Sequence, residues 1–201
     1  MKYKKPYLMY PSYVPNMHIA DFPTSKRATD VYIFSYGRKV PFQSENPDYT
    51  APLQETKNYD LVYQSLVQPE IFLKYDFLPT NKPALVVNKK IINILSEICP
   101  EDIQIFPATI VSEKPKKLTF ENHDFWVLNL TKTVNVIDET NSIYQQLENT
   151  PLKIPKKLTF VENSMNNCHI GRQFNYTPHV IVSPELAAIF KKEKVTGVKF
   201  L

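Results

Sequence analysis

One pattern occurs twice in this chain: an apolar run, a helix-capping residue, an apolar stripe at helical spacing, a turn and a second apolar run. The first copy spans residues 84–106 (ALVVNKKIINILSEICPEDIQIF) and the second spans residues 179–201 (HVIVSPELAAIFKKEKVTGVKFL). Asn88 and Ser183 stand at the cap position, where a side-chain oxygen can accept the free backbone N–H groups of the first helical turn. The pattern predicts two similar strand–helix–strand units.

The rest of the chain mixes strand and helix patterns without strict alternation. The run FWVL, residues 125–128, predicts a strand, and the stretch from Asn141 predicts a helix with Ile143, Tyr144 and Leu147 facing inward. We therefore expect an α+β fold with a mixed or largely antiparallel sheet, a few helices and two similar strand–helix–strand units.

The chain length suggests how these elements are grouped. A chain of 201 residues suits one large domain or two small lobes. Residues 1–70 are rich in Tyr and Pro and lack periodicity, so we expect an extended arm and a strand region packed on the same domain as residues 71–201. Tyrosines in such a segment suit core packing, and they also suit protein contact because they offer a large area at low entropic cost.

The hexapeptide PKKLTF occurs at Pro115–Phe120 and again at Pro155–Phe160. Alternation would turn its Leu and Phe inward and leave its lysines in water, which favours two basic strand starts. A paired site for phosphate or for a protein partner is the alternative interpretation.

Composition argues against several classes of function. The chain has 3 glycines and 17 prolines, whereas phosphate-binding loops need several glycines so that backbone amides can approach the anion. The formal net charge of +4 comes from lysine pairs spread along the chain, whereas nucleic-acid binders concentrate their basic residues. Neither a membrane-spanning run nor a secretory signal is visible. We expect a cytoplasmic protein that needs no cofactor and binds neither nucleic acid nor membrane.

Cys168 and His169 are the candidate nucleophile and base. Adjacent side chains of a strand point to opposite faces, so a Cys–His site would need His123 or His179 folded against Cys168. A loop thiol beside a surface histidine is the simpler interpretation. Cys99 and Cys168 stand far apart and outside any CxxC motif, which favours free thiols.

The remaining polar residues suggest no catalytic or metal site. The four histidines lack the spacing of metal ligands, so we expect no metal. The carboxylate pairs Glu101–Asp102, Glu121/Asp124 and Asp138–Glu139 fall where turns are predicted, and turns favour Asp and Glu for solvation and capping. General acid–base catalysis would need two carboxylates to converge in a cleft.

Three segments resemble a family of bacterial proteins. In FWVLNLTKTVNVIDETNSIY, residues 125–144, an aromatic pair and Leu-Asn are followed by a short strand, Asp138 and Ser142. The stretch ending in Phe106-Pro107 is similar to the family's upstream helix unit, and residues 180–200 are similar to its C-terminal signature. The family is the eleventh catalogued family of immunity proteins from polymorphic toxin systems, with its related domain of unknown function. The resemblance identifies residues 71–201 as an immunity-family-like α+β domain.

The resemblance implies a non-enzymatic bacterial protein that is encoded beside a toxin, binds it and blocks it by stoichiometric occlusion. The implied partner is a cognate toxin protein, and the chain could also form a homodimer. Inhibitors of nucleases often present an acidic face, so we select the acidic stretch 45–60 as the candidate partner-binding segment. Its candidate residues are Glu45, Asp48, Glu55, Asp60, Tyr49 and Tyr59.

Other interpretations stay open at this point. If the toxin is acidic near its active site, the lysines of the PKKLTF copies are the alternative contacts. A second function is a small enzyme of unrecognised class that uses Cys168 and His169. A third is a toxin-associated protein-binding module without protective activity.

Overall fold

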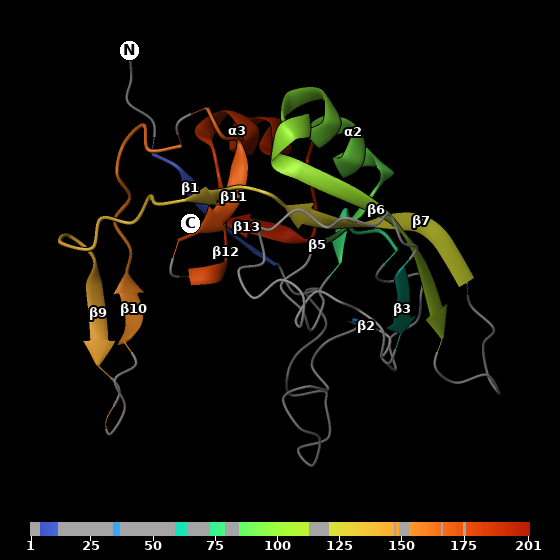
Figure 1. The fold of residues 1–201 in the computed structure, drawn as a ribbon, viewed down its shortest axis with the longest axis horizontal. Coiled ribbons are helices and arrows are strands. Elements are labelled where there is room, and N and C mark those ends of the chain that lie inside the picture. Colours follow the sequence, from blue (N-terminus) through green and yellow to red (C-terminus); the bar gives the residue numbers. More distant parts are fainter. Residues whose placement is uncertain are drawn as a thin grey trace.

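Figure 1 shows the computed structural model of the 201-residue chain. The structure describes residues 5–11, 34–36, 59–63, 73–78, 85–112, 121–146, 148, 153–165, 167–174 and 176–201. In this part of the chain, thirteen strands form three sheets. The α-helices α2 (Lys89–Ile98) and α3 (Pro184–Lys192) lie on the same side of the two larger sheets.

The expected α+β class with a few helices is wrong, because strands dominate the described chain. Two strands, β6 (Ile103–Ser112) and β7 (Glu121–Leu130), are each ten residues long. They extend well beyond the second apolar run of the first unit, which ends at Phe106, and beyond the strand predicted at residues 125–128. The fold is therefore a set of sheets with two short helices packed on them.

The largest sheet has six strands in the order β2-β3-β6-β7-β5-β4. Its neighbours are antiparallel except for β3 and β6, which are parallel. Besides β6 and β7, its strands are β2 (Phe34–Tyr36), β3 (Tyr59–Tyr63), β4 (Phe77–Leu78) and β5 (Leu85–Asn88).

The second sheet has five strands in the order β13-β1-β12-β11-β8. Only β11 and β8 are parallel neighbours. Its strands are β1 (Tyr7–Pro11), β8 (Thr133–Val134), β11 (Ile170–Gln173), β12 (Tyr176–Val182) and β13 (Val198–Phe200). Strands β1, β2 and β3 come from residues 1–70, and the division of the chain at residue 70 stays a prediction.

The two helices occupy equivalent places in the two larger sheets. Helix α2 connects β5 to β6, and β7 lies between these strands and is antiparallel to both. Helix α3 connects β12 to β13, and β1 lies between them in the same way. Each unit is thus a split strand–helix–strand motif whose gap is filled by a strand from elsewhere in the chain.

Both N-caps form as the sequence predicted. The Asn88 side chain accepts a hydrogen bond from the Ile91 N–H at the start of α2. The Ser183 hydroxyl accepts one from the Leu186 N–H at the start of α3. These bonds satisfy backbone donors that have no partner within the helix.

One apolar core joins the helices to both larger sheets. Alternation along β1 and β12 sends Met9 and Val182 toward this core, whereas Leu8 and Ile181 join a second cluster on the other face of the five-stranded sheet. The helices contribute to the first cluster the buried residues Ile91, Leu95, Leu186, Ala187 and Phe190. The second cluster also contains Val134, Val136 and Met165.

Asp76 connects the two units at the start of α2. Its carboxylate accepts hydrogen bonds from the Asn88 amide (2.9 Å) and from the Thr196 N–H (2.8 Å). Gly197 follows with a φ angle of 85°, and a Cβ atom there would lie 2.2 Å from the Phe77 carbonyl oxygen. The turn before β13 therefore needs glycine, both for its backbone angle and for its close approach to β4.

The third sheet is a two-stranded ribbon of β9 (Ile143–Gln146) and β10 (Lys153–Lys157). Figure 1 shows it standing apart from the two larger sheets. The predicted helix after Asn141 is therefore wrong, and the Ile143 side chain is 53% exposed rather than buried. Helical spacing over so short a segment does not exclude a strand, and Ile and Tyr favour strands.

The second PKKLTF copy ends a strand instead of starting one. Residues 155–157 close β10, and Phe160 forms an isolated bridge with Ile137. Leu158 and Phe160 pack against the second apolar cluster, and the lysines are exposed, as the alternation predicted. The first copy lies outside the described residues.

Candidate functional site

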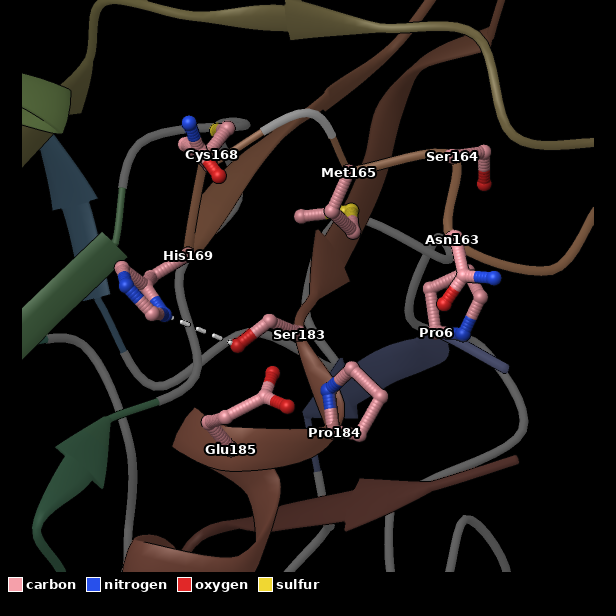
Figure 2. Close-up of a pocket in the computed structure, with 10 residues that line it drawn as sticks. Pro6, Asn163, Ser164, Met165, Cys168, His169, Ser183, Pro184 and Glu185 are labelled. Carbon is pink, nitrogen blue, oxygen red and sulfur yellow. Dashed lines mark hydrogen bonds between the residues drawn. The ribbon is translucent and has the colours of Figure 1, made fainter. Parts of the chain in front are cut away.

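A hollow of about 560 Å³ adjoins the turn that carries Cys168 and His169 (Figure 2). Its walls come from Pro6 before β1, from residues 163–165 and 167–169, and from the start of α3. Asn163 and Asn167 hold φ angles of 56° and 64° in this turn, a region that Asn tolerates better than most residues.

Backbone and side-chain hydrogen bonds fix His169 on both sides. Its N–H donates to Asp102 Oδ2 (2.8 Å), and its carbonyl oxygen accepts from the Ser183 N–H (2.9 Å). Its ring Nδ1 lies 3.0 Å from Ser183 Oγ, and Figure 2 shows the ring turned toward Ser183 and not toward the Cys168 thiol. Because the same hydroxyl caps α3 and Ser183 is only 2% exposed, this pair serves to join β11 to the helix.

The Cys168 thiol is not activated as a nucleophile. Burial raises its pKa, and the negative charge of Asp102 raises it further, to about 12. Its Sγ donates a hydrogen bond to the Ile170 carbonyl oxygen (3.2 Å). Cysteine reactions proceed through the thiolate, so a thiol that stays protonated at neutral pH is a poor candidate for catalysis.

A second hollow, of about 460 Å³, adjoins the same turn beside Asp102 and Lys132. The prediction of a solvated turn holds for the exposed Glu101 but is wrong for Asp102, which is 6% exposed. Asp102 Oδ2 accepts from the backbone N–H groups of His169, which precedes β11, and of Ile170, which begins it. Asp102 thus joins the end of α2 to the Cys168 turn.

The other predicted histidines lie away from Cys168. His123 is exposed on β7, with Nδ1 3.3 Å from the Thr109 hydroxyl. His179 lies on β12, its ring 6.3 Å from that of Tyr10, and burial lowers its pKa. In the part of the chain that the structure describes, no three His, Cys, Asp or Glu side chains are placed to hold a metal ion.

The structure does not describe the side chains of the acidic candidate segment 45–60. Glu45, Asp48, Tyr49 and Glu55 lie outside the described residues. Tyr59 and Asp60 belong to β3, whose backbone runs beside Ala108 and Thr109 of β6, and nothing is described of their side chains. Their role in partner binding stays a prediction.

The residues Asp138 and Ser142, which carried part of the family resemblance, build the base of the ribbon. Asp138 Oδ1 accepts from the N–H groups of Thr140 and Asn141, which closes a tight turn. The Ser142 hydroxyl accepts from the Thr159 N–H (2.9 Å). The two chain segments that enter and leave the ribbon are therefore tied together.

Sequence reasoning missed the exposed apolar residues of this ribbon. Ile143 and Ile154 are 53% and 48% exposed, although Ile143 was predicted to face inward. The signal that could have identified a strand is the pair of strand-favouring residues Ile143 and Tyr144, followed after a gap by a proline-containing basic run.

None of the helices within the described ranges is long and apolar enough to cross a membrane. The described residues define a β-rich protein with two short helices packed on its sheets. The chain matches the model of the Immunity protein family (Imm11) over residues 23–201, and it belongs to this family. No curated protein matches the chain. Membership confirms the resemblance and implies a toxin partner.

Proposed function

We propose that this chain binds a cognate toxin of a polymorphic toxin system and blocks it by stoichiometric occlusion, without catalysis. The observation that carries the proposal is membership of the Imm11 immunity family over residues 23–201. The Cys168 turn supports the non-catalytic part, because its thiol has a pKa of about 12 and its neighbouring histidine is engaged by Ser183.

Co-expression tests protection directly. Cells that express the product of the adjacent gene should grow only when this chain is present, and the two proteins should co-purify as a stable complex. Growth arrest despite co-expression would remove the proposal. A stable complex without rescue would favour the alternative of a toxin-associated binding module.

A titration separates occlusion from catalysis. At toxin concentrations well above Kd, residual toxin activity should fall linearly and reach its minimum at one equivalent of this chain. Full protection at a small fraction of an equivalent would indicate turnover and would contradict occlusion. A Cys168→Ala variant should protect as well as the wild type, whereas loss of protection in a folded variant would restore the enzymatic alternative.

The acidic stretch 45–60 is our proposed contact for a toxin with a basic active site. Neutralising Glu45, Asp48 and Glu55 together should slow association, because opposite charges steer the encounter of two proteins. Unchanged association at low salt would remove this segment as a contact. We also propose that the complex forms in the cytoplasm. Whether the free chain is a homodimer is tested by measuring its mass in solution.

A further inference from the structure

We infer that the ribbon of β9 and β10 is a docking element for the toxin, and that the toxin surface it contacts is apolar and rimmed by carboxylates. This inference rests on the proposed function, because it takes the toxin as the partner. It is carried by the strand register, the exposure and the charge of the ribbon.

The register places two isoleucines on one face. Ile143 and Gln145 share a face because side chains alternate along a strand. Gln145 lies opposite Ile154, and Lys157 lies opposite Ile143, since the register shifts by one residue between Pro155 and Lys157. We call the face formed by Ile143, Gln145, Ile154 and Lys157 the Ile face.

The two faces of the ribbon differ in burial. Ile143 is 53% exposed and Ile154 is 48% exposed, and Gln145 and Lys157 are exposed as well. On the opposite face Tyr144 and Pro155 are half-buried, and the Tyr144 hydroxyl donates to Glu139 Oε2 (2.6 Å). Gln146, farther along the Tyr144 face, is exposed. The opposite face is therefore partly covered only near the base of the ribbon, whereas all four residues of the Ile face are open to solvent.

Two further exposed apolar residues follow the strands that connect to the ribbon. Of the large hydrophobic side chains that are exposed among the described residues, four lie near the segment from Val134 to the ribbon. The Phe174 N–H donates to the Val134 carbonyl oxygen, and the Val161 N–H donates to that of Val136. Single exposed apolar residues are common on any surface, whereas Ile143 and Ile154 share one face of the ribbon and together form an exposed apolar patch.

The low stability of a two-stranded ribbon also favours docking to a partner. An isolated hairpin is only marginally stable in water, and β9 and β10 pack chiefly on each other. Neither Ile143 nor Ile154 joins the two apolar clusters formed by the described residues. Burial of both side chains against a partner would stabilise the ribbon and the complex together.

Charge identifies the chemistry of the partner surface. The Ile face carries Lys157 and no carboxylate, and Lys156 is exposed beside it at the register shift. Glu139, at the base, is already bonded to Tyr144. A toxin surface that complements this face is apolar in the middle and acidic at the edge. Isoleucines offer no stacking platform for bases, which argues against a single-stranded nucleic acid.

Binding of the adjacent gene's product to full-length variants tests the inference. Ile143→Asp combined with Ile154→Asp should raise Kd at least about a hundredfold, because both changes fall in the apolar centre of the contact. The matched control is Leu201→Asp, at a residue that is 70% exposed and lies at the end of the chain, and it should bind like the wild type. Far-UV circular dichroism and thermal unfolding establish that each variant is folded.

Two charge-reversal variants test whether the toxin surface has an acidic rim. Lys157→Glu should slow association about tenfold at low salt, with a smaller effect at high salt because exposed charges are screened. Lys192→Glu, an exposed change on α3, is its control and should leave the association rate unchanged. An equal effect of both variants would show that only net charge matters and would overturn the assignment of the rim.

The outcomes separate this inference from the proposed function. If the wild type binds and protects but the double Asp variant does so equally well, docking through the ribbon is overturned while immunity stands. If the wild type does not bind, both are overturned. Amide hydrogen exchange should show protection of residues 143–146 and 153–157 in the complex, and no protection would contradict docking. Binding of the free chain to anionic lipid vesicles that is abolished by the same variants would assign the face to a membrane instead.

Discussion

Replacing Asp76 should destabilise the fold strongly, because this buried carboxylate joins the start of α2 to the turn before β13. Asp76 is 6% exposed. It accepts hydrogen bonds from the Asn88 amide (2.9 Å), the Thr196 N–H (2.8 Å) and the Thr196 hydroxyl (3.0 Å). Lys90 Nζ lies 3.3 Å from the same carboxylate.

The magnitude follows from the donors that would lose their acceptor. A hydrogen bond to a charged group contributes about 1.5–3 kcal/mol, and a buried donor left without a partner costs about 1–3 kcal/mol. Lys90 is 38% exposed, and Thr196 is exposed as well, so both can be rehydrated. The loss therefore comes from the hydrogen bonds that Asn88 and Thr196 donate to the charged carboxylate, with a desolvation cost only at the half-buried Asn88. Asp76→Ala should lower the free energy of unfolding by about 4 kcal/mol. Asp76→Asn, which keeps the shape and one oxygen, should lower it by about 2 kcal/mol.

The pH dependence gives a second signature. Burial by itself would raise the pKa of Asp76, but hydrogen bonds from Thr196, Asn88 and Lys90 outweigh it and hold the pKa below its ordinary value of 3.8. A carboxyl whose pKa is lower in the folded state stabilises the fold fully above its unfolded pKa. This contribution is lost as pH falls below 3.8 and through the folded pKa.

Urea unfolding followed by tryptophan fluorescence, repeated from pH 7 to pH 3, measures both effects. Asp76→Asn should show a shallower loss of stability below about pH 4 than the wild type. Glu97→Gln, at an exposed carboxylate of α2, is the control and should change little. A loss below about 1 kcal/mol for Asp76→Ala at pH 7, or an acid dependence of Asp76→Asn equal to that of the wild type, would refute the reasoning.

Three further predictions concern other parts of the fold. Gly197→Ala should lower the free energy of unfolding by about 3 kcal/mol in the same urea assay, because φ is 85° and the new Cβ would lie 2.2 Å from the Phe77 carbonyl oxygen. Cys168 should resist iodoacetamide at pH 8 until the chain is denatured, since its pKa is about 12; rapid labelling of the folded protein would contradict this. Ser142→Ala removes the hydroxyl that accepts from the Thr159 N–H, so amide exchange in β9 and β10 should speed up about tenfold, while α3 stays protected.

Local signals made the helices predictable. Asn88 and Ser183 act as caps because their side chains reach backbone donors only three residues ahead. Lys191 and Lys192 follow in the last turn of α3, where the helix dipole favours cations. Such interactions depend on neighbouring residues, so a single sequence reveals them.

Strand pairing and the buried carboxylates were not predictable in the same way. The sequence near β5 and β6 does not indicate that β7 pairs between them. The sequence near β12 and β13 likewise does not indicate that β1 pairs between those two strands. Asp76 bonds to Thr196, 120 positions away, and Asp102 bonds to the His169 N–H, 67 positions away. An Asp beside a turn resembles a solvated residue until its distant partners are known, which explains the error at Asp102.

The ribbon's place in the topology explains how its surface can be independent of the core. Strands β8 and β11 are parallel neighbours, and parallel neighbours require a long crossover connection. The chain makes this crossover with residues 135–169, and the bonds between Ser142 and Thr159 close the base of the excursion. Among the described residues, the second apolar cluster takes Val136 and Phe160 from the two ends of the excursion but no side chain from β9 or β10. The core therefore constrains where the ribbon stands and leaves the side chains of its Ile face free to match a partner.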